Sequence, residues 1–320
     1  MLYHSTRSKN HTADSAQAVL QGLAPDGGLY MPAAIPAFDW KACLAGSSQD
    51  MATAILSALL PDIPDMKTLV ARAYTGKFET EDLTPSVKAG PFRVLELFRG
   101  PTSAFKDVAL CMLPQLLTAA KTQKGMAEDI MILTATSGDT GKAALEGFHD
   151  VEGIKICVFY PDGGVSRVQR AQMVTQEGNN VAVCAVRGNF DDAQTGVKNI
   201  FAQAVDGKLP GSHRLSTANS INIGRLAPQI TYYFKAYADL MQTGRIAFGD
   251  YVNFCVPTGN FGDILAGWLA KQLGLPVGKL ICASNANNVL TDFIRTGTYD
   301  RRQDPKGHGR GHHDPDRHLR

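Results

Sequence analysis

The sequence lacks a strong charge of either sign. Its 32 Lys and Arg residues nearly balance its 30 Asp and Glu residues, and charged residues make up only 19% of the 320 positions. Because 44% of the residues are hydrophobic, the composition is typical of a globular protein and argues against a disordered chain or a coiled coil. A nearly neutral chain has no overall field that would attract nucleic acid. We therefore expect about two globular domains and no nucleic-acid partner.

Long apolar runs and paired cysteines are also missing. No stretch of about 18 uninterrupted apolar residues could form a membrane-spanning helix, and the polar start MLYHSTRSKNHTADS has no secretory signal. The cysteines show no CxxC spacing, so we expect neither disulfides nor a metal site. Several of them lie in apolar runs, which predicts buried, reduced thiols in a cytoplasmic protein. The six are Cys43, Cys111, Cys157, Cys184, Cys255 and Cys282.

Apolar spacing predicts a chain that begins mainly with helices and then alternates strands with helices. A turn-rich piece, APDGGLYMPAAIP, interrupts the first part, and its Gly and Pro residues argue against regular structure there. The alternation that follows is typical of parallel βαβ units. Helices are expected over 16–23, 51–60, 66–74, 107–122, 141–148, 166–177, 193–205, 221–241 and 263–273, and strands over 94–98, 130–134, 154–160, 180–187, 251–256 and 279–283.

The pattern suggests four parts of the chain. Residues 1–90 form a mainly helical N-terminal region, residues 91–129 with 206–300 form a large domain, and residues 130–205 form a small α/β subdomain. Residues 301–320, RRQDPKGHGRGHHDPDRHLR, have no large apolar residue before Leu319 and are expected to be disordered. Their four histidines leave a metal-binding tail as an alternative to an unstructured or unrelated end.

Three segments combine a turn with the start of a helix. In GPTSAFKD, Lys106 lies among apolar residues, where a lysine can have a lowered pKa and act as an amine nucleophile; an ordinary surface lysine is the alternative. In TATSGDTG, residues 134–141, small hydroxyl and glycine residues precede a helix whose N-terminus could bind an anion. Simple helix capping explains the same residues.

The third segment is PTGNFGD, residues 257–263, between a strand and a helix. Its two glycines would let the backbone approach an oxyanion closely, although a generic glycine turn fits equally well. Together, a candidate imine-forming lysine and two anion-binding helix starts are the parts that a phosphate-bearing aldehyde cofactor needs.

These segments together with NSINIGRLAPQ resemble threonine synthase, a pyridoxal-phosphate enzyme of the tryptophan-synthase-β fold type (fold-type II). The likeness extends over about residues 1–300 and includes STR and APDGGLYMP near the N-terminus. It implies an α/β fold with a parallel sheet and flanking helices. It also implies the cofactor pyridoxal 5'-phosphate and a carbon–oxygen lyase of threonine biosynthesis that converts O-phospho-L-homoserine and water to L-threonine and phosphate.

The resemblance also implies roles for individual residues. Lys106 would form the internal aldimine and then move protons as a free amine. The cofactor phosphate would be held by Gly259, Asn260, Phe261, Gly262 and Asp263. The cofactor and substrate site would be lined by Ser137, Gly138, Asp139, Thr140, Asn219 and Arg225.

Two of these positions carry open questions. Arg225 could instead be a structural ion-pair partner. Arg99 stands where many family members have a histidine, so the resemblance assigns it no role.

Other functions remain open from the sequence. Family members continue past the point near Tyr299 where the likeness stops, which suggests a truncated or frameshifted and inactive chain, or a genuine short variant. A threonine dehydratase or phospholyase of the same fold type is a second alternative, and a non-catalytic module using the histidine-rich tail is a third. The long N-terminal region and the GDTG form of the second segment favour threonine synthase over the second alternative.

Overall fold

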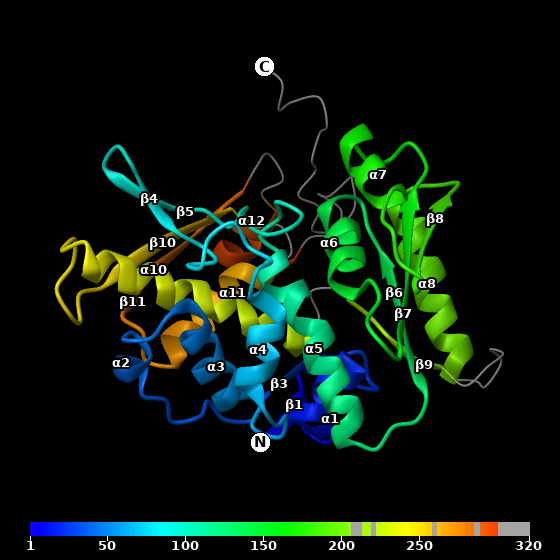
Figure 1. Cartoon of the computed structure of the whole chain (residues 1–320), viewed down its shortest axis with the longest axis horizontal. Coiled ribbons are helices and arrows are strands. Elements are labelled where there is room, and N and C mark those ends of the chain that lie inside the picture. The colour runs from blue at the N-terminus through cyan, green and yellow to red at the C-terminus, as the bar shows by residue number, and fades with distance from the viewer. Residues whose placement is uncertain (206–212, 219–221, 258–260, 285–288, 300–320) are drawn as a thin grey trace.

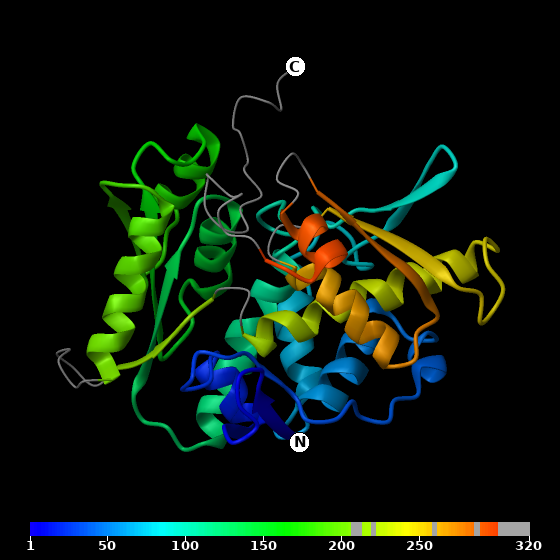
Figure 2. The same ribbon diagram turned by 180° about the vertical axis from the view of Figure 1, so that it is seen from behind.

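The computed structural model describes residues 1–205, 213–218, 222–257, 261–284 and 289–299. Helix α5 (Asp107–Gln123) lies at the centre, between a mainly helical part and a parallel sheet with its own helices (Figures 1 and 2). It contacts α1, α4, α6 and α9. Because α5 has neighbours on all sides, most of its side chains are buried, and it fixes the position of the residue that precedes it, Lys106.

The N-terminal part contains a small sheet as well as helices. Strand β1 pairs antiparallel with β2 and β3, and β3 falls inside the turn-rich piece for which no regular structure was expected. The sheet forms because the segment turns at Gly27 and Gly28 and returns alongside β1, a long-range pairing that local patterns do not reveal. The elements are β1 (Leu2–Ser5), β2 (Thr12–Asp14), α1 (Ser15–Gln21), β3 (Tyr30–Pro32), α2 (Trp40–Cys43), α3 (Ser48–Leu59) and α4 (Met66–Tyr74).

A β-hairpin connects this part to α5. Strands β4 (Ser86–Ala89) and β5 (Phe92–Leu95) pair antiparallel. The predicted strand over 94–98 was placed too late, because the turn at Gly90 sets the register of the hairpin. The hairpin projects from the body of the molecule (Figure 1), and Phe92 at its tip is 72% exposed.

A four-stranded parallel sheet follows, in the order β8-β7-β6-β9. Helices α6 and α7 lie on one face and α8 on the other (Figures 1 and 2). The alternation was predicted, but β9 was not, because four residues are too short for a clear period. The elements are β6 (Asp129–Ala135), α6 (Asp139–Phe148), β7 (Ile154–Pro161), α7 (Arg167–Val174), β8 (Val181–Val186), α8 (Phe190–Val205) and β9 (His213–Ser216).

The remaining elements return to the helical part. The predicted helix over 221–241 consists of α9, a 3-10 turn at Pro228 and α10. Strands β10 and β11 pair in parallel. Helix α12 was not predicted. The bounds are α9 (Ile223–Leu226), η1 (Ala227–Gln229), α10 (Ile230–Gln242), β10 (Val252–Pro257), α11 (Gly262–Gln272), β11 (Val277–Ala283) and α12 (Val289–Thr296).

The cysteines correct one expectation. Cys43 and Cys111 are buried thiols as predicted, but Cys184 and Cys255 are exposed, and Cys157 and Cys282 are partly so. Apolar runs can lie on strands with one open side: β8 is at the edge of its sheet and β10 belongs to a two-stranded one. The sequence pattern does not distinguish such strands from fully buried ones.

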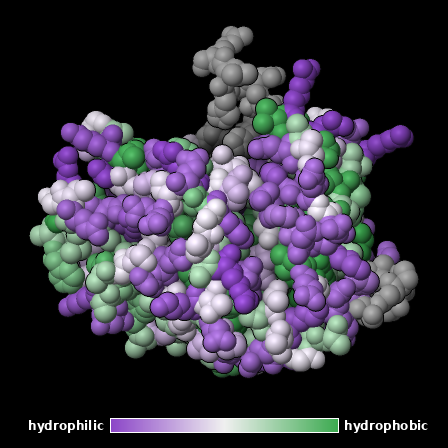
Figure 3. Space-filling view, viewed as in Figure 1, coloured by the Kyte–Doolittle hydropathy of each residue, from purple (hydrophilic) through white to green (hydrophobic). Residues whose placement is uncertain are grey.

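Within the described ranges, no helix has the length and apolar character needed to span a membrane. No cluster of potential metal ligands occurs there either. Hydrophilic and hydrophobic residues are interspersed over the face shown in Figure 3. The segment 301–320 lies outside the described residues, and the predicted division into domains stays a prediction.

Candidate functional site

Lys106 is the residue immediately before α5, and its side chain is only 14% exposed. Its Nζ lies 4.7 Å from the centre of the Phe105 ring and 2.5 Å from Oδ1 of Asp139. Burial lowers the pKa of Lys106 below its ordinary value, the Asp139 carboxylate acts in the opposite direction, and the charge of Arg225 adds to the lowering. The amine is therefore easier to deprotonate than that of a surface lysine, as the sequence analysis suggested for this position.

The turn before Lys106 is built around the buried carboxylate of Asp107. Its two oxygens accept hydrogen bonds from the backbone N–H and the hydroxyl of Thr102, and from the N–H of Ala104. A Cβ on Gly100 would lie 2.5 Å from the Cβ of Asp107, so only glycine fits there. This role of Asp107 was not predicted from the sequence, although an acidic residue in the first turn of a helix was a signal for it.

Asp139 comes from a second turn, between β6 and α6. The hydroxyl of Thr136 accepts hydrogen bonds from the N–H groups of Gly138 and Gly141 and donates one to the carbonyl of Gly138. A neutral hydroxyl therefore caps this turn. The Asp139 side chain makes no such cap, and its carboxylate reaches Lys106 from the first turn of α6. Thr136 was part of the predicted segment but was not singled out.

Arg225, in α9, is almost completely buried. One of its terminal N–H groups donates to the carbonyl of Ala218 at 2.5 Å, while its Nε has no hydrogen-bond partner among the described residues. Burial lowers the pKa of Arg225 to about 10, and the charge of Asp139 opposes that shift. A buried guanidinium with an unused donor is costly unless an anion satisfies it. These observations fit both a substrate-binding role for Arg225 and a structural ion-pair role, because the charge of Asp139 already stabilises the guanidinium.

The third predicted segment leads from β10 into α11. Phe261 precedes the helix with a left-handed backbone (φ 61°), an unusual conformation for a residue other than glycine. The charge of Asp263 acts on Lys106 and raises its pKa, and the backbone carbonyl of Asp263 accepts a hydrogen bond from the Tyr233 hydroxyl. The start of α11 therefore lies within electrostatic reach of the lysine.

The structure thus brings together Lys106, Asp139, Arg225 and Asp263 from four separate elements. Ser137, Gly138 and Thr140 share the turn of Asp139, and Ser137 is exposed. Phe261 and Gly262 share the turn of Asp263. Three predicted site residues, Asn219, Gly259 and Asn260, lie outside the described residues.

Arg99 has structural partners. Its guanidinium pairs with Glu79 at 2.7 Å and with Glu96, and its carbonyl accepts a hydrogen bond from the N–H of Glu79. These contacts tie the segment after α4 to the turn that begins at Gly100. In this chain the position therefore has a clear packing role.

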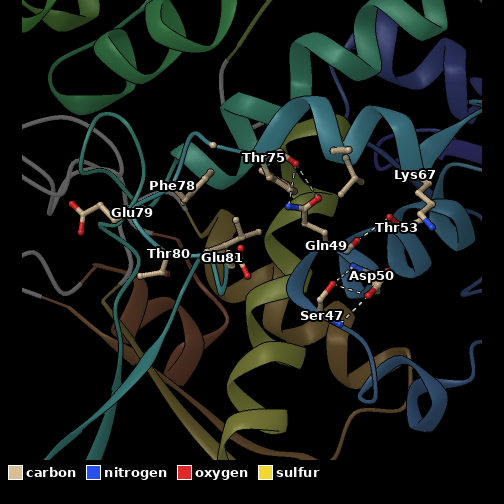
Figure 4. Close-up of a pocket in the computed structure, with 15 residues that line it drawn as sticks. Ser47, Gln49, Asp50, Thr53, Lys67, Thr75, Phe78, Glu79, Thr80 and Glu81 are labelled. Atoms are coloured by element: carbon tan, nitrogen blue, oxygen red, sulfur yellow. Dashed lines mark hydrogen bonds between the residues drawn. The ribbon is translucent and has the colours of Figure 1, made fainter.

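A cavity of about 450 Å³ lies away from this cluster, between α3, α4 and residues 75–83 (Figure 4). Ser47 and Asp50 at its rim form the capping box of α3, and Gln49 and Thr75 contact each other across it. None of the predicted site residues lines this cavity. This cavity therefore marks a different region from the one that charge and burial mark.

Two family models match the chain. Residues 2–74 match the family model described as threonine synthase N terminus, and residues 78–317 match that of the pyridoxal-phosphate dependent enzymes. The second match extends into residues 301–320, the segment whose composition differs from that of the rest of the chain.

Individual relatives give the same picture. Threonine synthase from Eremothecium gossypii is 41% identical over 95% of this chain and 62% of its own length. The crystal structure of pyridoxal-phosphate-bound threonine synthase from Brucella melitensis is 40% identical, with a TM-score of 0.83 over 94% of this chain and 64% of that one. This chain therefore spans less than two thirds of the length of either protein.

The structure of Escherichia coli threonine synthase is 34% identical, with a TM-score of 0.79, and the match covers 94% of this chain and 68% of that one. Sequence, fold and the converging Lys106 cluster therefore lead to one assignment. The chain belongs to the threonine synthase family of fold-type II pyridoxal-phosphate dependent enzymes.

Proposed function

We propose that this protein acts as a threonine synthase, which takes O-phospho-L-homoserine and water and releases L-threonine and phosphate. The observation that carries the proposal is the buried Lys106 amine, which pairs with the carboxylate of Asp139 and whose pKa is also lowered by the charge of Arg225. The family match over both of its parts supports it.

The residues present suit pyridoxal phosphate. Its aldehyde needs an amine that is neutral enough to react, and burial lowers the pKa of Lys106. Its phosphate needs backbone N–H groups at a helix start, and α11 begins at Gly262 within electrostatic reach of the lysine. Lys106 would hold the cofactor covalently, and the segment from Gly259 to Asp263 would hold its phosphate. When bound, the cofactor supplies an electron sink for a carbanion next to the substrate nitrogen.

Lys106 would then act as the base and acid that moves protons between neighbouring carbons of the substrate. A lysine can do this only if it alternates between its neutral and charged forms at working pH. Burial favours the neutral form, and Asp139, at 2.5 Å, stabilises the charged one. The opposition of these two effects suits a group that must accept a proton and then release it.

The substrate carries a carboxylate and a phosphate, and the site offers partners for anions. The Nε–H of buried Arg225, which has no partner among the described residues, is one donor. The turn of Ser137, Gly138, Asp139 and Thr140, with Asn219, would supply further polar contacts. Because Asp139 and Arg225 come from two different helices that both pack against α5, closure of these groups around the substrate would exclude water.

A turnover assay tests the proposal. The purified chain is mixed with pyridoxal phosphate and O-phospho-L-homoserine, and phosphate and threonine are followed together. We expect equal release of both products, lost in Lys106→Ala and retained in Lys124→Ala, which removes an amine from the far end of α5.

Two other results of this assay would contradict the proposed activity. Phosphate without threonine would assign a phospholyase instead. Neither product, from a chain that still binds the cofactor, would refute the proposed activity.

A further inference from the structure

Two cysteines meet on the small parallel sheet, away from the cluster of Lys106. The sulfur atoms of Cys157 in β7 and Cys184 in β8 lie 3.7 Å apart. Cys157 is level with Ala182 in the neighbouring strand, so Cys184 lies two residues further along and on the same face of the sheet. The two thiols are therefore diagonal neighbours, separated by 27 positions in the chain.

The surroundings allow these thiols to react and to move. Cys184 is exposed and Cys157 is partly buried, packed with the hydrophobic side chains under α8. Strand β8 is at the edge of its sheet and pairs only with β7 in that sheet. Strand spacing puts the Cα atoms of such diagonal neighbours about 8 Å apart, which is more than a disulfide spans, so β8 must shift for the bond to form. An edge strand can make such a shift more easily than a central one.

A second pair of cysteines in the chain provides a contrast. Cys255 in β10 is level with Ile281, and Cys282 in β11 is level with Val256. The two cysteines are thus offset by one residue, which sends their side chains to opposite faces of the strand pair. Cys255 and Cys184 are both exposed, so the two cysteine pairs differ mainly in how their side chains are placed relative to each other.

We propose that Cys157 and Cys184 are a modification site that forms a reversible intrachain disulfide when the protein meets a hydroperoxide. The proposal concerns the small sheet alone and is independent of the proposed enzyme activity.

The chemistry proceeds in two balanced steps. The Cys184 thiolate attacks one peroxide oxygen, the O–O bond breaks, and the products are the sulfenic acid of Cys184 and an alcohol, or water from hydrogen peroxide. The Cys157 sulfur then attacks the sulfenyl sulfur, the S–S bond forms, and hydroxide leaves with the Cys157 proton as water. In total two thiols are oxidised by two electrons and one peroxide is reduced.

The order of the steps follows from the surroundings of each thiol. Burial and the neighbouring Cys184 raise the pKa of Cys157 to about 12, which makes it the poorer first nucleophile. Cys184 faces solvent and meets the peroxide first. The disulfide would protect the exposed thiol from irreversible oxidation and would link the edge strand to its neighbour.

Peptide mapping of the whole folded chain tests the proposal. The reduced protein is treated with hydrogen peroxide, the remaining thiols are alkylated, and trypsin is used without reductant. We expect peptides 156–167 and 171–187 to appear linked, at their summed mass less two hydrogen atoms, and to separate after reduction. Peptides 246–271 and 280–295, which carry Cys255 and Cys282, should stay unlinked in the same sample.

Variants separate the two steps. Cys157→Ser should leave Cys184 as a sulfenic acid that dimedone captures, while the unmodified chain gives the linked peptides and little capture. Dimedone capture of Cys184 in the unmodified chain without a link would overturn the proposal. So would a Cys255–Cys282 link of equal yield, or linkage between two chains, because each would show that the 3.7 Å contact does not direct the reaction.

Discussion

The turns that lead into α5 and α6 carry the two ends of the Lys106–Asp139 ion pair, yet they are built differently. The turn before α5 closes around a buried carboxylate, Asp107, which accepts three hydrogen bonds. The turn before α6 closes around the neutral hydroxyl of Thr136. A buried charge that loses a hydrogen-bond donor is costly, so loss of any partner of Asp107 should strongly destabilise the first turn. Loss of a partner of the neutral Thr136 hydroxyl should destabilise the second turn less.

The difference suggests that the two turns restrict the positions of Lys106 and Asp139 to different degrees. Lys106 is held by a turn in which Gly100 has no room for a Cβ, so its backbone has little freedom. Asp139 projects from the first turn of a helix that lies over a separate sheet (Figure 1). We infer that the amine is the fixed member of the pair and the carboxylate the adjustable one. The following four changes test this comparison.

Lys106→Ala should have the largest effect on activity. It removes the amine to which we assign cofactor attachment and proton transfer in the proposed function, so we expect a loss of at least about 10³-fold in turnover. The fold should persist, because the change removes the ion pair with Asp139 and the contact with the Phe105 ring but leaves the buried side chains of α5 in place. Turnover and far-ultraviolet circular dichroism measured on the same preparation check both statements.

Asp107→Asn should reduce stability more than any change in the α6 turn. The NH₂ group of the new Asn side chain would face the N–H and O–H groups that now donate hydrogen bonds to the carboxylate. We expect this change to lower the free energy of unfolding by about 2–3 kcal/mol. A shift of Lys106 should also lower turnover by about 10–100-fold. Urea unfolding and turnover measure the two effects, and Thr102→Ser, which keeps the hydroxyl, serves as control. A cost no greater than that of the Thr136 change below would contradict the comparison.

Thr136→Val keeps the shape of the side chain and removes the cap of α6. The N–H groups of Gly138 and Gly141 lose their acceptor, so we expect a loss of about 1 kcal/mol in the free energy of unfolding. Lys106 belongs to the other turn, and its pKa should not change. Urea unfolding, with Thr136→Ser as the matched control, measures the cost of the cap alone.

Asp139→Asn should change stability least, by about 0–1 kcal/mol for a partly exposed ion pair. Its main effect is on titration. Asp139 raises the pKa of Lys106 against the effect of burial, so its loss lowers that pKa further. Capture of pyridoxal phosphate, which needs the neutral amine, should therefore extend to lower pH, as absorbance would show. Asp129→Asn, at the start of strand β6 that precedes the turn, should leave the profile unchanged.

The same shift predicts how stability depends on pH. The pKa of Lys106 is lower in the folded chain than in the unfolded chain, so the unfolded chain binds more protons between the two values. Stability therefore rises with pH through that window, and Asp139→Asn should widen the window at its lower end. Urea unfolding at several pH values would show the dependence beginning at a lower pH in the variant, and an unchanged starting pH would contradict the assigned role of Asp139.

Much of the fold could be predicted from the sequence because most elements carry a local signal. Met66 to Tyr74 has helical spacing and forms α4 with those bounds, and Ser166 is the N-cap of α7 as expected. The elements that escaped prediction have little local signal. Strands β3 and β9 are three and four residues long and exist because a distant strand pairs with them.

The sequence by itself determined the family, the α/β alternation and the choice of Lys106, because helix periodicity, turn residues and short motifs are properties of neighbouring residues. Only the tertiary structure decided that Asp139 pairs with Lys106 and that Asp107 closes its turn. It also showed that Cys157 touches Cys184 while Cys255 and Cys282 are offset. Distances between residues far apart in the chain depend on strand register and helix packing, and burial then sets the pKa of the amine.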